Sequence, residues 1–418
     1  MMREAKSSGI AWIGTIPKCW ETDKLKYHLR RNEPRNPGDV VVLSLYRELG
    51  VIPKDSRDDN HNVTSEDTSK YKYVRPGDFV INKMKAWQGS VAVSEYEGIV
   101  SPAYFVYEFT DDTIFKRYFH YLLRSCYKDE FMRLSGGIRV GQWDLPADAL
   151  GNTPILIPPM DEQCRIADFL DTKCAEIDAL TADIQTQIDT LEQYKRSVIT
   201  ETVTKGLNPD AEMKDSGIQW IGDMPAHWDV IRGKYILRYM QKPVREDDGV
   251  ITCFRDGEVT LRSNRREDGF TMSDKEIGYQ GIDVGDLVVH GMDGFAGSIG
   301  ISDSRGKASP VLNVLDTDQC KRYIMYYLRS MAYSDVFLAL ATGIRVRSCD
   351  LRWNKLAELS YPVPPLDEQN AIVKHIDSVL SKADAVIADK KAQLATLDEY
   401  KKSLIFEYVT GKKEVPAS

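Results

Sequence analysis

The 418-residue sequence has few cysteines and no long hydrophobic run. Its seven cysteines are scattered, with no Cys-x-x-Cys pair and no Cys/His cluster at zinc-ligand spacing. No stretch approaches the roughly 20 apolar residues that span a bilayer, and the first residues lack the apolar core of a signal peptide. We therefore expect reduced structural thiols, no metal site and a soluble cytoplasmic protein.

Motifs of common catalytic chemistry are also missing. There is no Gly-x-x-x-x-Gly-Lys-Ser/Thr loop for nucleotide phosphates, and Asn-Thr-Pro-Ile at 152–155 is a poor likeness of an amino-methyltransferase motif. The six histidines show no His-x-x-x-His pair and no obvious grouping with serine and aspartate, although a catalytic triad is recognised by geometry rather than by spacing. The sequence therefore predicts a protein without catalytic residues.

An excess of positive charge is missing as well. The chain carries 55 Lys and Arg against 63 Asp and Glu, a net charge of −8, whereas neutralising nucleic-acid phosphates requires cations. Most of the excess acidity lies in residues 161–210, which hold 5 basic and 11 acidic side chains. The other parts are close to neutral and can present local basic faces, so net charge does not exclude a nucleic-acid partner.

What the sequence does contain is a second copy of itself. Residues 8–27 recur at 216–235 with an offset of 208. After small insertions and deletions the offset becomes 206, where Pro-Pro-Met-Asp-Glu-Gln at 158–163 matches Pro-Pro-Leu-Asp-Glu-Gln at 364–369. The chain is therefore interpreted as a full tandem duplication.

Each copy combines a strand-rich part with a long helical part. Short β-branched runs separated by Gly, Asp and Pro, followed by an amphipathic helix, are typical of an α+β domain. The Pro-Pro-x-Asp-Glu-Gln segment is a helix-start signal, and no Pro or Gly follows it for about forty residues. We predict α+β domains at residues 1–159 and 208–365, alternating with helical spacers at residues 160–207 and 366–418.

Apolar residues recur every seven positions in both predicted helices, a spacing that calls for a partner helix. About 43 residues at 1.5 Å each give a helix on the order of 65 Å long, longer than a globular domain needs. We therefore predict an antiparallel coiled coil, with packing of each helix on its own domain as the alternative. Its predicted core is Leu170, Ile177, Ile184, Leu191, Val198, Ile376, Leu397 and Leu404, with Ala383 in the same row and Leu180 and Tyr194 in the neighbouring row.

Antiparallel helices would place the two domains at opposite ends, related by a pseudo-twofold axis. Dimeric DNA-binding proteins use such symmetry to meet two half-sites at a set spacing. Here the equivalent segments Glu-Leu-Gly-Val-Ile-Pro-Lys and Asp-Gly-Glu-Val-Thr-Leu-Arg diverge while the flanking sequence agrees. The sequence thus predicts that the two domains recognise different half-sites.

The domain-helix-domain-helix order, the two Pro-Pro starts, the Ser-Gly-Ile-x-Trp-Ile-Gly openings and the Gly-Ile-Arg-Val segments resemble the specificity (S) subunits of Type I restriction-modification systems. The resemblance covers essentially the whole chain. It implies a prokaryotic protein with two target recognition domains that read an asymmetric bipartite site in double-stranded DNA. It also implies helical spacers that dock two methyltransferase subunits, which restriction subunits can join.

Cofactors, by the same resemblance, belong to the partner subunits. S-adenosylmethionine is expected in the methyltransferase subunits, and ATP and magnesium in the restriction subunits. No cofactor is expected in this chain.

Reading DNA sequence requires long side chains that donate to base edges, supported by cations on phosphates. Solvated surface charge is the ordinary alternative for any one of the candidate residues, and Trp87 suits a core position equally well. The candidates fall in equivalent loops of the two copies: Arg47, Lys54 and Arg57 with Arg255, Arg262, Arg265 and Arg266; Lys83, Lys85, Trp87 and Gln88 with His290 and Phe295; and Arg139 with Arg345 and Arg347 in the Gly-Ile-Arg-Val segments.

Two other groups of residues are interpreted as structural. The tryptophans shared by both copies, Trp12, Trp20, Trp220 and Trp228, are expected in the core. The acidic face of the first long helix is expected to be solvated or to dock a methyltransferase; it comprises Asp168, Asp171, Asp178 and Asp183.

Three functions outside the main hypothesis stay open at this point. One is a coiled-coil scaffold with protein-binding domains. Another is the specificity subunit of a methyltransferase that lacks nuclease partners. The third is a hydrolase in its own right, for which no motif is present.

Overall fold

The structure is a computed structural model that describes residues 3–38, 40–47, 49–56, 64, 67–137, 143–265, 277–340 and 351–416. It divides into two compact units: unit 1 comprises residues 1–184 with 392–418, and unit 2 comprises residues 185–391. The four-part division expected from the sequence kept each long helix whole. The division into units instead crosses both helices, because each end of a helix packs against a domain.

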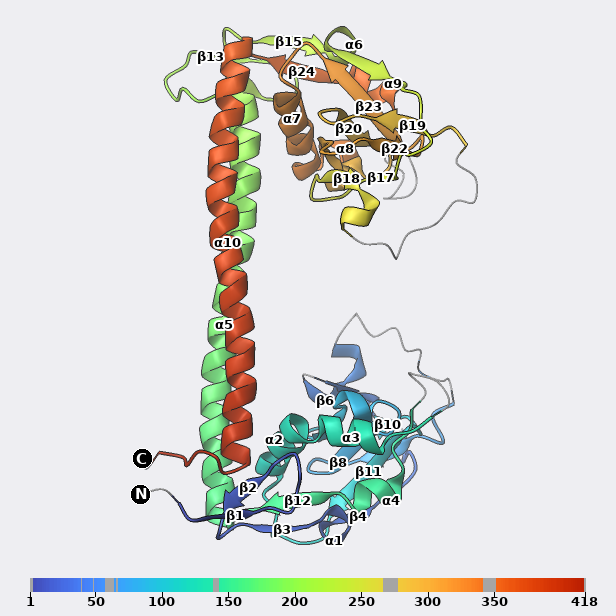
Figure 1. The fold of residues 1–418 in the computed structure, drawn as a ribbon, viewed down its shortest axis with the longest axis vertical. Helices are drawn as coiled ribbons and strands as arrows, with labels where there is room; N and C mark the ends of the chain where they lie inside the picture. The colour runs from blue at the N-terminus through green and yellow to red at the C-terminus, as the bar shows by residue number, and fades with distance from the viewer. Residues whose placement is uncertain are drawn as a thin grey trace. The chain divides into compact units, whose positions relative to one another are not determined.

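Unit 1 holds a mixed α/β domain centred on a four-stranded antiparallel sheet of order β4-β11-β8-β9 (Figure 1). Two-stranded pairs surround this sheet: β1 with β2, β3 with β12, β5 with β6, and β7 with β10. The elements of this domain are β1 (Ala5–Ser7), β2 (Thr15–Pro17), β3 (Glu21–Lys24), α1 (Leu25–His28), β4 (Leu29–Arg31), β5 (Leu43–Tyr46), β6 (Gly50–Pro53), η1 (Lys54–Ser56), β7 (Lys72–Val74), β8 (Phe79–Asn82), η2 (Ala86–Gln88), β9 (Val91–Val93), β10 (Gly98–Val100), β11 (Tyr104–Phe109), α2 (Lys116–Cys126), α3 (Lys128–Leu134), α4 (Ala147–Gly151) and β12 (Pro154–Ile157).

Both faces of the central sheet are buried, and the alternation along its strands assigns each side chain to a face. Phe79 and Ile81 of β8 belong to the core that includes α2, whereas Val80 between them belongs to a second core with the β5-β6 and β7-β10 pairs. In β11, Phe105 lies in the first core and Val106 in the second. The domain therefore has two cores, one on each face of the sheet.

Unit 2 repeats this architecture. Its central sheet has the order β16-β23-β20-β21, element for element the order of unit 1, and it too separates two cores. The duplication in the sequence is therefore a duplication of the fold. Its elements are β13 (Met213–Asp215), β14 (Asp223–Pro225), β15 (Asp229–Arg232), α6 (Gly233–Ile236), β16 (Leu237–Met240), β17 (Ile251–Cys253), β18 (Val259–Leu261), η3 (Arg262–Asn264), β19 (Gln280–Ile282), β20 (Leu287–His290), η4 (Gly294–Ala296), β21 (Ile299–Ile301), β22 (Gly306–Ala308), β23 (Leu312–Thr317), α7 (Lys321–Tyr333), α8 (Val336–Ala339), α9 (Trp353–Glu358) and β24 (Ser360–Val363).

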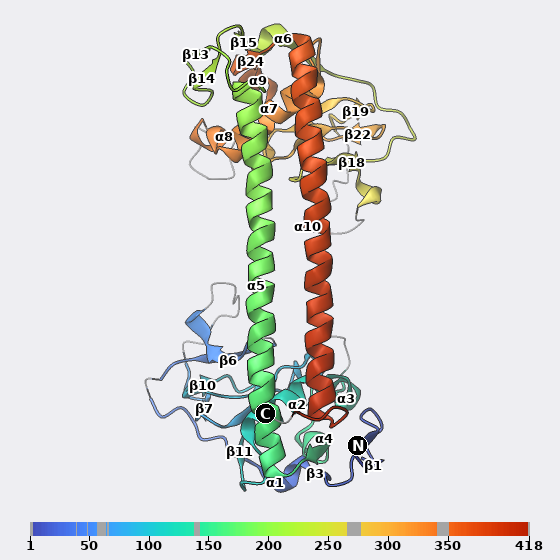
Figure 2. The same cartoon turned by 90° about the vertical axis from the view of Figure 1, so that its left-hand side faces the viewer.

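Two long helices, α5 (Met160–Lys205) and α10 (Leu366–Val409), start directly after the Pro-Pro segments. In Figures 1 and 2 the parts of α5 and α10 that belong to one unit run side by side. In unit 1 the nitrogen Nζ of Lys401 lies 2.5 Å from a carboxylate oxygen of Asp178. In unit 2 Lys195 lies 2.6 Å from Asp384. The two helices therefore contact each other antiparallel within each unit, and the two ion pairs are equivalent at the offset of 206.

Burial along the helices follows most of the expected heptad row. The structure buries Leu170, Ile177, Ile184, Ile376, Ala383 and Leu404 and half-buries Leu191, Val198 and Leu397. The neighbouring row differs, because Leu180 is 47% exposed and Tyr194 is 52% exposed. Successive helical residues are turned by about 100°, so Leu180 points about 60° to one side of Ile177. The buried Cys174 lies on the other side of Ile177, and Leu180 is therefore turned away from the buried face.

None of the helices that the structure describes is both long and apolar enough to cross a membrane. The six cysteines among the described residues are free thiols. Across the same residues, no three His, Cys, Asp or Glu side chains come together in a way that could hold a metal ion.

Candidate nucleic-acid interface

A hollow of about 350 Å³ opens in the domain of unit 1, where β5, the end of β8 and the start of β11 meet. Two candidate residues from the sequence, Lys54 and Lys85, line it, and none of the described lining residues carries a carboxylate. Its lining residues are Val42, Leu43, Ser44, Lys54, Thr64, Tyr71, Asn82, Met84, Lys85, Ser101, Ala103 and Tyr104.

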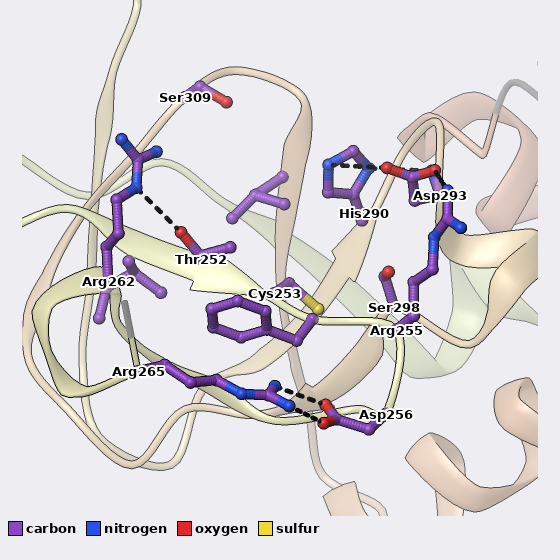
Figure 3. A pocket seen from close by; sticks show the side chains of 13 residues that line it. Thr252, Cys253, Arg255, Asp256, Arg262, Arg265, His290, Asp293, Ser298 and Ser309 are labelled. Carbon is purple, nitrogen blue, oxygen red and sulfur yellow. Dashed lines mark hydrogen bonds and ion pairs between the residues drawn. The ribbon is translucent and has the colours of Figure 1, made fainter. Parts of the chain in front are cut away.

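The domain of unit 2 has a hollow of about 580 Å³ in the equivalent place (Figure 3). Its lining residues are Ile251, Thr252, Cys253, Phe254, Arg255, Asp256, Arg262, Arg265, His290, Asp293, Ser298, Ser309 and Leu312. Seven positions line both hollows at the offset of 208: Leu43 and Ile251, Ser44 and Thr252, Lys54 and Arg262, Asn82 and His290, Lys85 and Asp293, Ser101 and Ser309, and Tyr104 and Leu312.

Some of these shared positions keep their chemistry. Lys54 and Arg262 both place a cation at the start of a 3-10 turn after a strand. Lys54 hydrogen-bonds the hydroxyl of Thr64, and Arg262 Nε donates to Thr252 Oγ1 at 3.4 Å (Figure 3). Each hollow therefore combines a cation with hydroxyl groups, a combination that suits phosphate oxygens or base acceptors.

Other shared positions change their chemistry completely. Asn82 is replaced by His290, Tyr104 by Leu312, and Lys85 by Asp293. The first change exchanges a carboxamide for an imidazole, the second a phenol for an alkyl group, and the third a cation for an anion. The two hollows share a position in the fold and differ in the groups that they present.

In unit 2 two of the candidate arginines are held by carboxylates. Arg255 Nη2 lies 3.1 Å from Asp293 Oδ1. Arg265 forms a two-pronged pair with Asp256 (Figure 3). Its guanidinium carbon lies 4.3 Å from the centre of the Phe254 ring. The hydrogen bonds that Arg265 donates to the Asp256 carboxylate raise the pKa of Arg265. The Arg265 side chain is thus fixed by its own domain rather than freely solvated.

His290 is held as a neutral imidazole. Burial lowers its pKa, and the ring atom Nδ1 accepts the backbone N–H groups of Met292 at 3.2 Å and Asp293 at 2.9 Å. An imidazole that accepts at Nδ1 carries its proton on Nε2. Nε2 lies 3.8 Å from Asp293, so position 290 offers a directed N–H donor beside a carboxylate.

The other candidates in unit 1 have different environments. Arg47 hydrogen-bonds Gln88, and its carbonyl oxygen accepts from Arg124 of α2, so Arg47 lies toward α2 rather than in the hollow. Lys83 forms an ion pair with Asp144 at 2.8 Å. Lys85 is exposed, and no ion pair to it occurs among the described residues.

The aromatic candidates of these loops, Trp87 and Phe295, pack within their domains. Trp87 is half-buried, packs against Trp143 with ring centres 5.5 Å apart, and donates its indole N–H to the carbonyl of Met84 at 3.1 Å. Phe295 packs on the main core of unit 2. The candidates Arg57, Arg139, Arg266, Arg345 and Arg347 lie outside the described residues.

The shared tryptophans are structural. Trp20 and Trp228 are completely buried, and Trp12 and Trp220 pack on the cores of their units.

Sequence reasoning missed how the two motif glutamines join helix to domain. Gln163 Oε1 accepts the backbone N–H of Phe115, and Gln163 Nε2 donates to the carbonyl of Pro158, each at 2.8 Å. In unit 2, Gln369 makes the same contacts with Cys320 and Pro364, each at 2.9 Å. The Asp-Glu-Gln repetition was visible in the sequence, but it was interpreted as a helix start and a feature of the family resemblance, not as a contact between helix and domain.

The acidic face of α5 is also used within the chain. Asp168 and Asp171 both form ion pairs with Arg117 of α2, and Asp171 accepts a hydrogen bond from Tyr121. In unit 2, Arg322 and Tyr326 of α7 hold Asp377 in the same way. Plain solvation is therefore wrong for these aspartates, because each anchors its domain to the adjacent long helix. The available signal was the Arg-x-x-x-Tyr spacing repeated in α2 and α7, Arg117 with Tyr121 and Arg322 with Tyr326.

Comparison with known proteins agrees with this architecture. Residues 28–190 match the Type I restriction modification DNA specificity domain. The chain is 24% identical to the putative type I restriction enzyme MjaX specificity subunit of Methanocaldococcus jannaschii, over 96% of each chain. It is 23% identical to the MjaVIII specificity subunit of the same organism, over 96% of this chain and 94% of that one.

A chain from a structural study of complex assembly and conformational transition of the type I R-M system shares the fold. Its TM-score is 0.68 at 14% identity, over 95% of this chain and 99% of that chain. The matching domain is described as a DNA specificity domain, and both curated relatives are named as specificity subunits. The chain thus resembles type I restriction enzyme specificity subunits over nearly its whole length, and its residues 28–190 match the DNA specificity domain of such systems.

Proposed function

We propose that this chain reads an asymmetric, bipartite site in double-stranded DNA for a type I restriction-modification complex. Each domain binds one half-site, and the paired helices α5 and α10 set the distance between the half-sites. The observation that carries this proposal is the pair of equivalent hollows, which keep a cation and hydroxyl groups but differ at Asn82 and His290, Lys85 and Asp293, and Tyr104 and Leu312.

The division of chemistry within the hollows fits the two tasks of a DNA-binding surface. Phosphate contacts fix position and are the same for every sequence, whereas contacts to base edges carry the sequence information. A cation retained in both copies, Lys54 and Arg262, suits the first task. Side chains that change between the copies suit the second, so the two half-sites are expected to differ.

The long helices supply the assembly surface in this proposal. They dock two adenine methyltransferase subunits, and through them restriction subunits where these are present. S-adenosylmethionine then belongs to the methyltransferase subunits, and ATP and magnesium to the restriction subunits. The duplicated anchors Asp171 and Asp377 would hold each domain in a fixed orientation on its helix.

The test is the pattern of adenine methylation in cells that carry the partner methyltransferase with and without this chain. With the chain, we expect methylated adenines in a motif of two unlike short sequences separated by a fixed number of unspecified bases. Without it, the motif should disappear. An unchanged methylation pattern would contradict the proposal and favour the scaffold with protein-binding domains.

A further inference from the structure

Position 85 in unit 1 and position 293 in unit 2 carry opposite charges on the same piece of backbone. Each is the residue before a 3-10 turn, η2 or η4, with φ and ψ of −124° and 10° at Lys85 and −102° and 4° at Asp293. The carbonyl of Lys85 accepts the N–H of Gln88 at 2.9 Å, and that of Asp293 accepts the N–H of Ala296 at 2.9 Å. The backbone therefore presents both side chains from the same place.

The strand before each turn is also held in the same way. The N–H of Asn82 donates to the carbonyl of Ser90 at 3.1 Å, and the N–H of His290 to that of Ser298 at 3.0 Å. Lys85 and Asp293 both line the hollow of their unit. The charge inversion is thus a change in the chemistry of the hollow and not a consequence of different folding.

A phosphate contact gives no reason for such an inversion. DNA phosphates carry the same charge in every half-site, so a position that contacts phosphate favours a cation in both copies. Base edges differ in this respect, because guanine presents two acceptors in the major groove and cytosine presents an amino donor. A cation can donate to guanine and a carboxylate can accept from cytosine, so exchanging one for the other suits a change of base.

The surroundings leave both side chains able to bind. Lys85 is exposed, and none of the described residues forms an ion pair with it. The Asp293 side chain is 40% exposed and accepts from Arg255 at 3.1 Å. A carboxylate has about four acceptor sites, so Asp293 keeps acceptor capacity for a further donor.

We propose that positions 85 and 293 determine the base specificity of the two domains, with Lys85 donating to guanine in one half-site and Asp293 accepting from the amino group of cytosine in the other. This inference rests on the proposed function, because it assigns a base contact within the DNA-binding hollows. It goes further by naming one position that sets one base in each half-site.

The experiment exchanges the charge within the complete complex of this chain with its methyltransferase partner. Lys85→Asp introduces the side chain that unit 2 already carries on the same backbone, so the turn accommodates it. Lys24→Asp is the matched control, because Lys24 is an exposed residue of β3 that does not line the hollow. Methylated motifs are sequenced in cells, and bound sequences are selected from a randomised DNA pool by the purified complex.

We expect Lys85→Asp to alter one base position in one half-site, replacing a preference for guanine by a preference for cytosine, with the other half-site unchanged. Discrimination at that position should change roughly 5- to 150-fold. The reciprocal variant Asp293→Lys should alter one position in the other half-site. Lys24→Asp should leave the motif as it is.

Two results would overturn the inference. One is an unaltered motif in the Lys85→Asp complex. The other is a uniform loss of binding to all sequences with a shallower dependence on salt, which marks a phosphate contact. If the variant complex no longer methylates DNA in cells, the sequences that the purified complex selects from the DNA pool show whether the base preference has changed, and the same two results would overturn the inference. Failure of the proposed function is a separate outcome, because it would appear as the absence of any motif with the unaltered chain.

Discussion

Replacing Gln163 with alanine is expected to destabilise unit 1 by about 2–5 kcal/mol, because each buried polar group left without a partner costs about 1–3 kcal/mol. Gln163 is 1% exposed, and its side chain bonds the N–H of Phe115 and the carbonyls of Thr113 and Pro158, all at 2.8 Å. These bonds join the start of α5 to the segment that leads into α2. Their loss should loosen the domain on its helix.

The measurement is amide hydrogen exchange followed separately for α2 and α7. Gln163→Ala should lower protection in α2 of unit 1, and Gln369→Ala should lower protection in α7 of unit 2, since Gln369 is completely buried and bonds Cys320 and Pro364. Gln193→Ala, at an exposed position of α5, is the control and should change stability by less than about 0.5 kcal/mol. Equal protection in all three variants would show that the glutamines do not hold the domains.

Removing the one cation that occupies an equivalent position in both hollows is expected to weaken DNA binding by the complex by at least about 10-fold and to reduce the slope of log affinity against log salt by about two. The variant is Lys54→Ala with Arg262→Ala. These residues line equivalent hollows, and the contacts between domain and helix do not include them. The loss should therefore occur without a loss of stability.

The control for this variant uses a second equivalent pair of cations, Lys24→Ala with Arg232→Ala. Both lie on exposed edges of β3 and β15, outside the hollows. Affinity is measured by titrating labelled duplex DNA at several salt concentrations. If the two double variants weaken binding equally, the hollows have no special part in contacting DNA.

The sequence alone predicted the features of the fold that appear as repeats or regular spacings of residues. The offset of 208 predicted that the domains repeat, and the helix-start motifs predicted where α5 and α10 begin. The heptad row predicted buried positions such as Leu170 and Ile177. Leu180 shows the limit of that reasoning, because a side chain one row away from the stripe is apolar and still exposed.

The candidate site was less accessible, because it depends on contacts between distant segments. Lys54 and Lys85 lie 31 positions apart and still line one hollow, and no spacing rule predicts this. The ion pair that holds Arg265 against Asp256 likewise depends on how a loop folds back. Asp171 was expected to be solvated or to dock a methyltransferase, and its contacts with Arg117 and Tyr121 became visible only in the fold.

The central claim is that two equivalent domains on one framework read two different half-sites, and it is tested most directly by making the domains identical. The altered chain carries a second copy of residues 29–153 in place of residues 237–359. These segments are equivalent: they begin at β4 and β16 and end shortly before the long helices. Methylation sequencing of cells that carry this altered chain with its partner methyltransferase should give a motif that contains one original half-site twice. A motif that still contains the second original half-site would contradict the account.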